Sequence, residues 1–244
     1  MLEQKVTLVV GGHSSVARQL YVELGHTRTF VALSRHSEPL ENVNLIQADA
    51  VDAQQMQEAV AQVLEKFGRI DEYIHLVGSI LIKPLHQTTV SQWHDVLNVN
   101  LNSIYYGLHA VLPAMMRQKQ GNIVLVSSVA ALLGLANHEA IAAAKGAVAS
   151  LVPTLASTYA LSNIRVNGLA PTLVNSQMAQ SLVQNELAMK ATVEMIPLRR
   201  IATPKDVAGA IAFLCSDSAT FINGQVLPVD GGMVSVRRPP RISV

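Results

Sequence analysis

The segment NHEAIAAAKG, from Asn137 to Gly146, carries the residues best suited to move protons or hold charge. Its alanine-rich run predicts a helix, and that helix carries one lysine, Lys145, in its middle. His138 lies seven residues earlier, two helical turns away, so the two side chains would share a face if both positions are helical. A histidine can donate a proton near neutral pH, whereas Ile141, one turn before the lysine, has none to give.

Both candidates also have structural explanations. Lys145 could lay its stem along apolar surface and reach solvent with its ammonium group, although the strand patterns on both sides of its helix favour a functional role. His138 could cap the helix or lie on the surface beside Asn137 and Glu139. The sequence leaves the catalytic and structural interpretations of His138 equally open.

The segment LVVGGHSSVARQLYVEL is typical of a strand, a tight turn and a helix that bind a dinucleotide. Such a site needs small residues for the turn, for the approach of the backbone to the pyrophosphate and for helix–strand packing. At the expected spacing these residues are Gly11, Ser15 and Ala17, of which only the first is glycine. The motif alone is weak, but its position directly after the first predicted strand favours a nucleotide site over a plain strand–turn–helix.

The second predicted strand ends in ALSRH, where a dinucleotide fold reads the 2′ position of the ribose. An acidic residue there would bind a 2′-hydroxyl and repel a 2′-phosphate. Ser34 and Arg35 instead offer a hydroxyl and a cationic fork that suit a phosphate, and His13 could add a third contact. The alternative is a solvated surface arginine. We therefore predict NADP(H) as the cofactor, with NAD(H) less favoured.

Seven short β-branched runs must position these residues. They cover residues 5–10, 30–34, 44–48, 73–77, 122–128, 165–170 and 225–230. The runs are apolar throughout, as expected for strands covered on both faces, and helical patterns such as SVARQLYVEL and AQQMQEAVAQVLEKF fill the gaps. This alternation predicts an α/β fold with a doubly wound parallel sheet, and 244 residues fit one such domain.

The composition excludes several classes of protein. Lys+Arg number 18 and Asp+Glu 17, so the chain has no charge footprint for nucleic acid or an anionic membrane. Hydrophobic residues make up 50% and charged residues 14%, which predicts a large core and a subunit interface. No uncharged apolar run reaches the ~18 residues of a membrane-spanning helix. We read no signal peptide, and the single cysteine, Cys215, fits a reduced cytoplasm.

Further motifs follow these elements along nearly the whole chain. They are GGHSSVA, QADAVD, FGRIDEYIHLVG, WHDVLNVNL, GNIVLVSS, IRVNGLAP and FINGQVLPVDGGM. Together with Lys145 in the helix after GNIVLVSS, they resemble the short-chain dehydrogenase/reductase family. The resemblance implies a single Rossmann-type domain, a nicotinamide cofactor and a homo-oligomer, either a tetramer or a dimer.

The resemblance also implies roles for individual residues. The catalytic set would be Asn100, Ser128 and Lys145, to which we add His138. Ser128 would donate a hydrogen bond to the substrate oxygen, and Asn100 would anchor a water through its helix; the structural alternatives are a plain strand-end serine and a buried asparagine bonded to backbone. Asp49 and Ala50 would lie against the adenine. The implied cofactor-binding residues are Gly11, His13, Ser14, Ser15, Val16, Ser34, Arg35, Asp49, Ala50, Val77, Gly78, Lys145, Pro171 and Val174.

The chain departs from the family pattern at its most telling position. The family places a proton-donating tyrosine four residues before the lysine, where this chain has Ile141. Several departures are similar to the divergent enoyl-acyl-carrier-protein reductase branch: Ser15-Val16-Ala17 in place of the later glycines, and His75 to Gly78 at the fourth strand. That branch places its tyrosine seven residues before the lysine, which is His138 here. Ser128 instead matches the ordinary reductases, so the site is a hybrid.

The resemblance implies a catalytic domain over residues 1–236, with a substrate lid at 172–198, and a C-terminal tail at 237–244. Three methionines in the lid, Met178, Met189 and Met195, predict either an adaptable apolar pocket or an oligomer core, and the sequence does not separate these. Pro153 predicts a kink in the helix after Lys145.

We therefore expect an NADPH-dependent oxidoreductase that transfers hydride to a carbonyl or an activated C=C bond. Its substrate would be a small molecule or an acyl thioester, and we expect no metal, nucleic-acid or membrane partner. Two alternatives stay open because Ile141 replaces the usual acid. One is a nucleotide-binding regulator or scaffold without turnover, and the other is an isomerase or dehydratase that uses His138 as a base.

Overall fold

Seven parallel strands form one sheet in the computed structural model, which describes residues 4–237. The strand order is β3-β2-β1-β4-β5-β6-β7, and every neighbouring pair is parallel. The strands are β1 (Lys5–Val10), β2 (Arg28–Ser34), β3 (Asn44–Gln47), β4 (Glu72–His75), β5 (Gly121–Val126), β6 (Ile164–Pro171) and β7 (Val226–Val229). The predicted single-domain, doubly wound α/β fold is confirmed, and each predicted run overlaps one strand.

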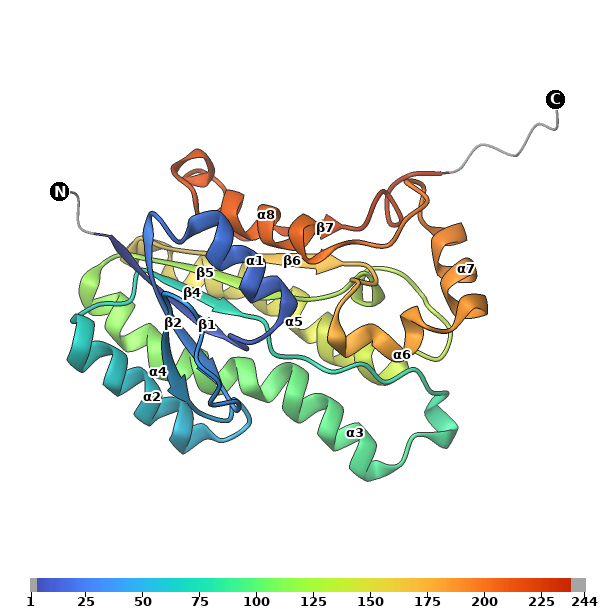
Figure 1. Cartoon of the computed structure of the whole chain (residues 1–244), viewed down its shortest axis with the longest axis horizontal. Coiled ribbons are helices and arrows are strands. Elements are labelled where there is room, and N and C mark those ends of the chain that lie inside the picture. The colour runs from blue at the N-terminus through green and yellow to red at the C-terminus, as the bar shows by residue number, and fades with distance from the viewer. Residues whose placement is uncertain (1–3, 238–244) are drawn as a thin grey trace.

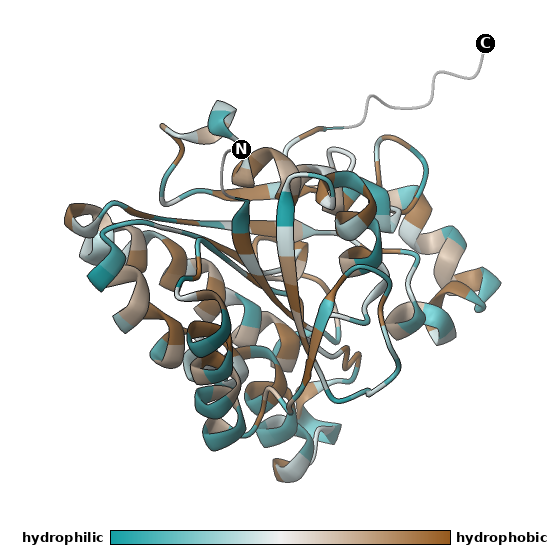
Figure 2. Ribbon diagram, turned by 60° about the vertical axis from the view of Figure 1, so that its left-hand side comes forward, coloured by the Kyte–Doolittle hydropathy of each residue, from teal (hydrophilic) through white to brown (hydrophobic). Residues whose placement is uncertain are grey.

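Helices cover both faces of this sheet (Figure 1). They are α1 (Ser15–Leu24), α2 (Ala53–Phe67), α3 (Val90–Leu97), α4 (Ser103–Gln118), α5 (Glu139–Tyr159), α6 (Gln180–Val183), α7 (Glu186–Met195) and α8 (Pro204–Cys215). Because side chains alternate along a strand, Leu8 and Val10 join a core with α2, α4 and α5, whereas Val9 joins a second core with α1 and α8. Figure 2 shows the apolar strands in brown between these layers.

Local sequence signals set the ends of α1 and α2. The hydroxyl of Ser14 accepts a hydrogen bond from the backbone N–H of Ala17 and so caps α1. Asp52 caps α2 by accepting from the N–H groups of Gln54 and Gln55. Gly68 ends α2 in the left-handed conformation, with φ 71°, where glycine carries no Cβ penalty. Both helices therefore begin where their apolar periodicity predicted.

Helix α5 is the longest helix and carries Lys145. It continues through Pro153 to Tyr159. Residues Glu139–Ser162 are long and apolar enough to cross a membrane by length and composition alone, with a mean hydropathy of 1.4. However, the core helix of a soluble protein passes the same test, and Val148, Val152 and Ala156 of α5 are buried against the sheet. The side of α5 that carries these residues belongs to the core, and 39% of the apolar window is buried.

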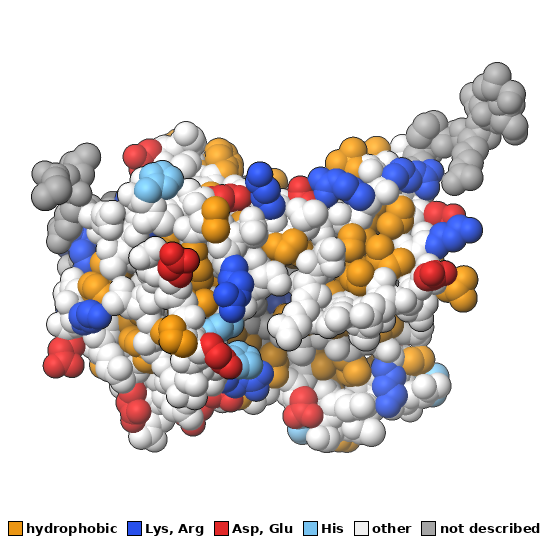
Figure 3. Space-filling view, in the orientation of Figure 1, with side chains coloured by type: hydrophobic (Ala, Val, Ile, Leu, Met, Phe, Trp, Pro, Cys, Tyr) orange, Lys and Arg blue, Asp and Glu red, His pale blue; other side chains and the backbone are white. Residues whose placement is uncertain are grey.

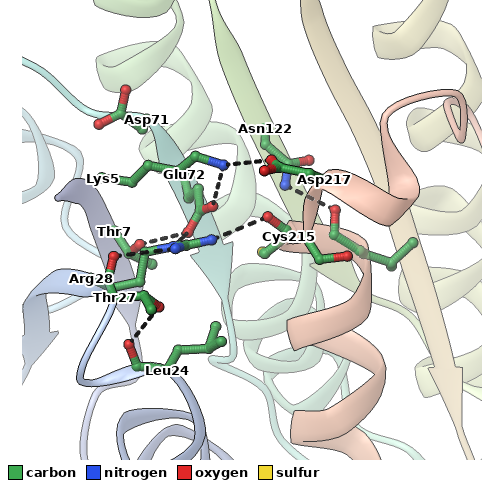
Figure 4. Close-up of polar contacts among 12 residues, drawn as sticks. Lys5, Thr7, Leu24, Thr27, Arg28, Asp71, Glu72, Asn122, Cys215 and Asp217 are labelled. Atoms are coloured by element: carbon green, nitrogen blue, oxygen red, sulfur yellow. Dashed lines mark hydrogen bonds and ion pairs between the residues drawn. The ribbon is translucent and has the colours of Figure 1, made fainter. Parts of the chain in front are cut away.

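A polar cluster closes the amino end of the sheet (Figure 4). The carboxylate of Glu72 on β4 accepts hydrogen bonds from the Thr7 hydroxyl at 2.6 Å and from Nε of Arg28 at 2.9 Å. Lys5 Nζ lies 3.9 Å from the other oxygen of Glu72, an ion-pair distance too long for a hydrogen bond, and 3.4 Å from Asp217. The cluster ties β1, β2 and β4 together at the end of the sheet opposite the carboxyl ends of the strands.

The connection between α3 and α4 contains one π turn, Asn98–Asn102. Such turns add a residue to the helical repeat and often occur at functional sites. This one places Asn100 fully inside the molecule. Of the predicted tail at 237–244, only Arg237 belongs to the described residues; the rest of the tail, and residues 1–3 of the predicted domain, lie outside them.

Candidate active site

One cavity of about 860 Å³ lies at the carboxyl ends of the strands. Strand order reverses between β1 and β4, and ligands of doubly wound folds bind where this happens. The wall of the cavity contains every predicted catalytic and cofactor-binding residue, from Gly11 to Val174. Figure 3 shows the surface hollowed beside the α6–α7 segment, with hydrophobic side chains (orange) gathered on that side. The structure thus brings the predicted residues together, while their roles remain predictions.

The turn after β1 is built for close approach of the backbone. Gly11 has φ 87°, and a Cβ there would lie 3.2 Å from the backbone of Val77. Gly12 is also required, because a Cβ at that position would clash with the side chain of Ala32. Both N–H groups of this pair donate to the carbonyl of Leu33. The turn therefore depends on two adjacent glycines, whereas the sequence pattern singled out only the first.

Helix α1 starts immediately after this turn and points its first N–H groups at the cavity. Ser14, Ser15 and Val16 all line the wall there. The amino end of a helix carries free N–H groups and a partial positive charge, which together bind phosphate. The small Ala17 is fully buried against the sheet. The arrangement fits a pyrophosphate.

The end of β2 supplies the groups expected at a ribose 2′ position. The Ser34 hydroxyl accepts a hydrogen bond from the N–H of His36. The side-chain amide of Gln47 donates to the carbonyl of Arg35 at 3.0 Å, which fixes its backbone. The Arg35 guanidinium lines the cavity, and within residues 4–237 no hydrogen bond or ion pair to another side chain is recorded for it. It is available for an anionic ligand.

His13 and His36 stand together beside Arg35. Their rings are 5.5 Å apart in an edge-on contact. His13 Nε2 lies 2.8 Å from the carbonyl of Glu38, which can only accept, so this nitrogen carries the proton. His36 was not among the predicted site residues, yet it lines the same wall. Its place directly after Arg35 in ALSRH was the signal that could have indicated it.

Asp49 and Ala50 follow β3 on the same side of the cavity. The N–H of Asp49 donates to the side chain of Gln55, and its carboxylate accepts from the N–H of Val51 at 3.1 Å. Ala50 is buried. These bonds fix the loop that was predicted to lie against the adenine.

Gly78, Asn100 and Lys145 meet at the centre of the cavity. A Cβ on Gly78 would lie 3.1 Å from Oδ1 of Asn100 and 3.5 Å from Nζ of Lys145. Asn100 accepts from the N–H of Ser79 and donates to the Ser79 hydroxyl at 2.8 Å. Its amide also donates to the carbonyl of Val96. Ser79 is therefore a site residue that the sequence interpretation missed; its position directly after Gly78 at a strand end was the available signal.

Lys145 is buried and held by backbone. Its ammonium group donates to the carbonyl of Val126 at 2.9 Å. The Ser127 hydroxyl donates to the carbonyl of Lys145 at 2.7 Å, which fixes this turn of α5 against the end of β5. Burial lowers the pKa of Lys145 to about 8, because a charged group loses solvation inside the protein.

A hydrogen-bonded chain supports this centre from behind. The Tyr73 hydroxyl lies 2.8 Å from Nδ1 of His75, and Nε2 of His75 lies 3.0 Å from the Ser103 hydroxyl. Ser103 donates to the carbonyl of Val99 in the π turn, so its oxygen accepts from His75. Burial, and then the charge of Lys145, lower the pKa of His75 to about 3. His75 is therefore neutral and ties β4 to the turn that carries Asn100.

Ser128, His138 and Ile141 complete the wall around Lys145. The Ser128 oxygen accepts from the N–H of Ala130. His138 precedes the first residue of α5, and its Nδ1 lies 2.7 Å from the carbonyl of Ala136 instead of capping the helix. His138 thus lies just before the helix that carries Lys145, so the condition for a shared helical face, that both positions be helical, is not met. Ile141, one turn before Lys145, is 6% exposed and packs against Val96 and Ala130.

The segment after β6 covers the other side of the cavity. Met178, Leu182, Ala188, Thr192 and Met195 line it, and Ile80, Ile82 and Leu135 lie on the remaining wall. Met189 is not among the described lining residues. Within residues 4–237, the Asp, Glu, Lys and Arg side chains of the wall are Arg35, Asp49 and Lys145. The same part of the chain shows no cluster of three or more metal-ligating side chains.

Comparisons with known proteins agree on one family of enzymes. Residues 21–234 match a family model described as Enoyl-(Acyl carrier protein) reductase. The chain is 33% identical to the 3-oxoacyl-[acyl-carrier-protein] reductase FabG of Thermotoga maritima, over 96% of this chain and 99% of that protein. It is 30% identical to a cyclopentanol dehydrogenase of a Comamonas species, over 95% and 97% of the two chains. The solved structure of ElxO with NADP bound has a TM-score of 0.89 at 27% identity, and the match covers 96% of this chain and 100% of that one.

Proposed function

Because the chain belongs to the short-chain dehydrogenase/reductase family, we propose that it is an NADPH-dependent reductase of a carbonyl group or an activated C=C bond. Family membership makes it an NAD(P)-dependent oxidoreductase; the direction and the substrate are the proposal. The observation that carries it is the single cavity that joins the Gly11 turn, Arg35 and Lys145.

The residues present fit the cofactor. Gly11 lets the turn after β1 pass close to the backbone of Leu76 and Val77, where a Cβ would be crowded, and Ser14, Ser15 and Val16 at the amino end of α1 line the cavity where the pyrophosphate would bind. The unpaired Arg35 guanidinium matches a 2′-phosphate better than a ribose hydroxyl. The remaining contacts are proposed for Val77, Gly78, Pro171 and Val174, which line the cavity at the ends of β4 and β6. When bound, the reduced nicotinamide supplies the hydride.

The active-site residues would divide the other tasks. Ser128 would donate a hydrogen bond to the substrate oxygen, where negative charge develops. Lys145 would hold the nicotinamide ribose, and Asn100 would fix the turn beside it. We propose an atypical site of hybrid character, because Ile141 stands at the position of the usual tyrosine and His138 at the position used by the enoyl branch.

The lid and the facing wall favour an uncharged, largely apolar substrate. Methionine and aliphatic side chains cover this part of the cavity, and methionine adapts to varied apolar shapes. The charged groups of the wall lie on the cofactor side or at Lys145. We therefore propose that residues 172–198 act as a lid over an acyl chain or an apolar ring, which suits the substrates named for 3-oxoacyl-[acyl-carrier-protein] reductase and cyclopentanol dehydrogenase. We also propose that the protein forms a homo-oligomer and works in a reduced cytoplasm.

One observation favours a second candidate function. Ile141 removes the usual acid from the site, so the chain could bind nucleotide as a regulator without turnover. That function predicts cofactor binding without NADPH oxidation by any carbonyl or enoyl compound. Turnover of one substrate at a rate typical of enzymes excludes it.

Fluorescence titration with NADPH and NADH tests the cofactor assignment. We expect NADPH to bind more tightly than NADH. Arg35→Ala should weaken NADPH binding by about 10- to 100-fold, the loss expected for one charged hydrogen-bonding group, and should leave NADH binding nearly unchanged. The matched control is Arg117→Ala, an exposed arginine at the end of α4. Absence of binding by either cofactor would overturn the proposed function.

A further inference from the structure

We propose that the Lys145 ammonium group is itself the proton donor of the reduction in this protein, in place of a phenol. This inference rests on the proposed function, because it assigns the proton source of that reaction. It follows from three observations: which groups reach the cavity, what surrounds the lysine charge, and where the alternative donors lie.

No phenol is available at the site. The five tyrosines of the chain all belong to the described residues, and none of them lines the cavity. Tyr73 is fully buried, and its hydroxyl bonds to His75. Ile141 presents an aliphatic side chain at the position one turn before Lys145. Near Gly78, Ser79 and Asn100 bond to each other, so the donor candidates that we compare are Ser128, His138 and Lys145.

The Lys145 charge has no counterion. Within residues 4–237 its ammonium group makes no ion pair, and its one recorded acceptor is the neutral carbonyl of Val126. An ammonium group has three N–H donors, so two remain for ligands in the cavity. His75, on β4, is the titratable neighbour whose pKa responds to this charge, and it is neutral.

The other titratable groups near α5 lie away from Lys145. The elements packed against α5 are β5, β6, α3 and the turns beside them. Arg165 of β6 bonds to the carbonyls of Ile222 and Leu214, and His94 and Asp95 of α3 are exposed. A buried ammonium group without an opposite charge beside it is costly. An oxyanion that forms beside it relieves that cost, either by pairing with the charge or by taking the proton.

The pKa of Lys145 suits a general acid that protonates the substrate oxygen. A general acid works best when its pKa lies near the working pH, and burial brings the pKa of Lys145 to about 8. As the carbonyl carbon accepts the hydride, the C=O π pair moves onto oxygen. One N–H bond of Lys145 then breaks as the O–H bond of the alcohol forms. The neutral amine regains a proton from water, so each turnover consumes one carbonyl, one hydride and one proton.

The two other candidates are less well placed. His138 lies before the first residue of α5, so the regular helical spacing that relates position 141 to Lys145 does not place it. Its Nδ1 is already used by the carbonyl of Ala136. Ser128 can donate a hydrogen bond to the oxyanion, but giving up its proton would leave a serine alkoxide about as basic as the substrate oxyanion, so the transfer has little driving force. Lys145 is the group that can both stabilise the negative charge of the oxyanion and donate a proton to it.

Two substitutions separate proton donation from charge. Lys145→Arg keeps a positive charge that is not given up in proteins, so we expect NADPH affinity within a few-fold of wild type and a fall in kcat of at least about 100-fold. Lys145→Ala should lose activity and regain it saturably with added methylamine, in proportion to the methylammonium fraction. For wild type, log kcat/KM should fall with rising pH above about 8, the pKa of Lys145, and His138→Ala should keep this profile.

A second measurement does not depend on turnover. Carbon-13 NMR of labelled lysine, with Lys145 assigned by its absence in Lys145→Arg, should show a titration midpoint near 8 in the protein without cofactor. A midpoint above about 10, the ordinary lysine value, overturns the inference. So does wild-type kcat in Lys145→Arg, or loss of the alkaline limb in His138→Ala. If NADPH binds but no substrate is reduced, the proposed function fails instead, whatever the NMR midpoint.

Discussion

Burial of the Lys145 ammonium group costs the folded protein stability, as its lowered pKa indicates. The ammonium group is buried, and the carbonyl of Val126 is its one recorded partner. Burial lowers its pKa from 10.5 to about 8, and a shift of one pKa unit corresponds to about 1.4 kcal/mol. The folded protein without cofactor therefore carries a cost of about 3 kcal/mol at neutral pH. Active sites commonly hold such costs because the same feature serves function.

We predict that Lys145→Met stabilises the cofactor-free protein. Methionine keeps the stem volume and removes the buried charge, so the free energy of unfolding at pH 7 should rise by about 1–3 kcal/mol. Below the folded-state pKa of about 8, the lysine is charged in both the folded and the unfolded protein, so the two proteins differ most in their free energy of unfolding. As pH rises from 8 towards 10.5, Lys145 loses its proton in the folded state before it does so in the unfolded state. The stability of wild type therefore rises until it matches that of Lys145→Met.

Urea unfolding of both proteins from pH 6 to pH 10.5 checks this prediction. Lys66→Met is the matched control, because Lys66 is exposed at the end of α2. A constant difference between wild type and Lys145→Met across this range would contradict the electrostatic cause. A less stable Lys145→Met would show that packing of the stem dominates.

At the scale of elements, one glycine sets the distance between α4 and β4. A Cβ on Gly107 would collide with the hydroxyl of Tyr73, whose bond to His75 begins the chain that reaches the π turn. The position of Asn100 thus depends on how closely α4 approaches the sheet. The contact joins core packing to the geometry of the site.

We predict that Gly107→Ala destabilises the protein by about 2–4 kcal/mol, the sum of overpacking and one disrupted buried hydrogen bond. Urea unfolding measures the loss. Gly209→Ala on α8 is the control, because nothing lies within 4 Å of a Cβ there; it should gain about 0.5–1 kcal/mol from helix propensity. Equal effects of the two substitutions would mean that α4 can move away from β4 without cost.

The sequence predicts these elements better than it predicts what joins them. Strands covered on both faces are apolar throughout, and the caps Ser14 and Asp52 mark helix starts. The seven strands, α1 and α2 could therefore be predicted from the sequence. The π turn at Asn98–Asn102 was not, because its extra residue is stabilised by the bond from Ser103 to Val99 and by Asn100, which depend on packing. Gly12 was missed for a similar reason: the Ala32 side chain that crowds it lies on another strand.

Across the whole molecule, the two ends of the sheet have different chemistry. The carboxyl end opens into the cavity, where the Lys145 ammonium group makes no ion pair with any residue that the structure describes. The amino end is closed by Glu72, which is 1% exposed and bonded to Thr7 and Arg28. Charges at this end are matched across three strands and cannot reach the cavity wall, where none of these residues lies. Fold stability and ligand binding should therefore respond to different substitutions.

We predict that Glu72→Gln lowers the free energy of unfolding by about 3 kcal/mol, because it leaves Arg28 buried without its partner charge. Asp217→Asn is the matched control: this carboxylate also pairs with Lys5, but its side chain is 94% exposed, and exposed pairs contribute little. NADPH affinity should be unchanged in both variants, because the cavity is built from the other end of the same strands. Urea unfolding and NADPH titration on the same samples decide the matter. If Glu72→Gln unfolds at the same urea concentration as wild type, water solvates Arg28 in place of the carboxylate. If Glu72→Gln loses NADPH affinity at a temperature where it is folded, the two ends of the sheet are coupled.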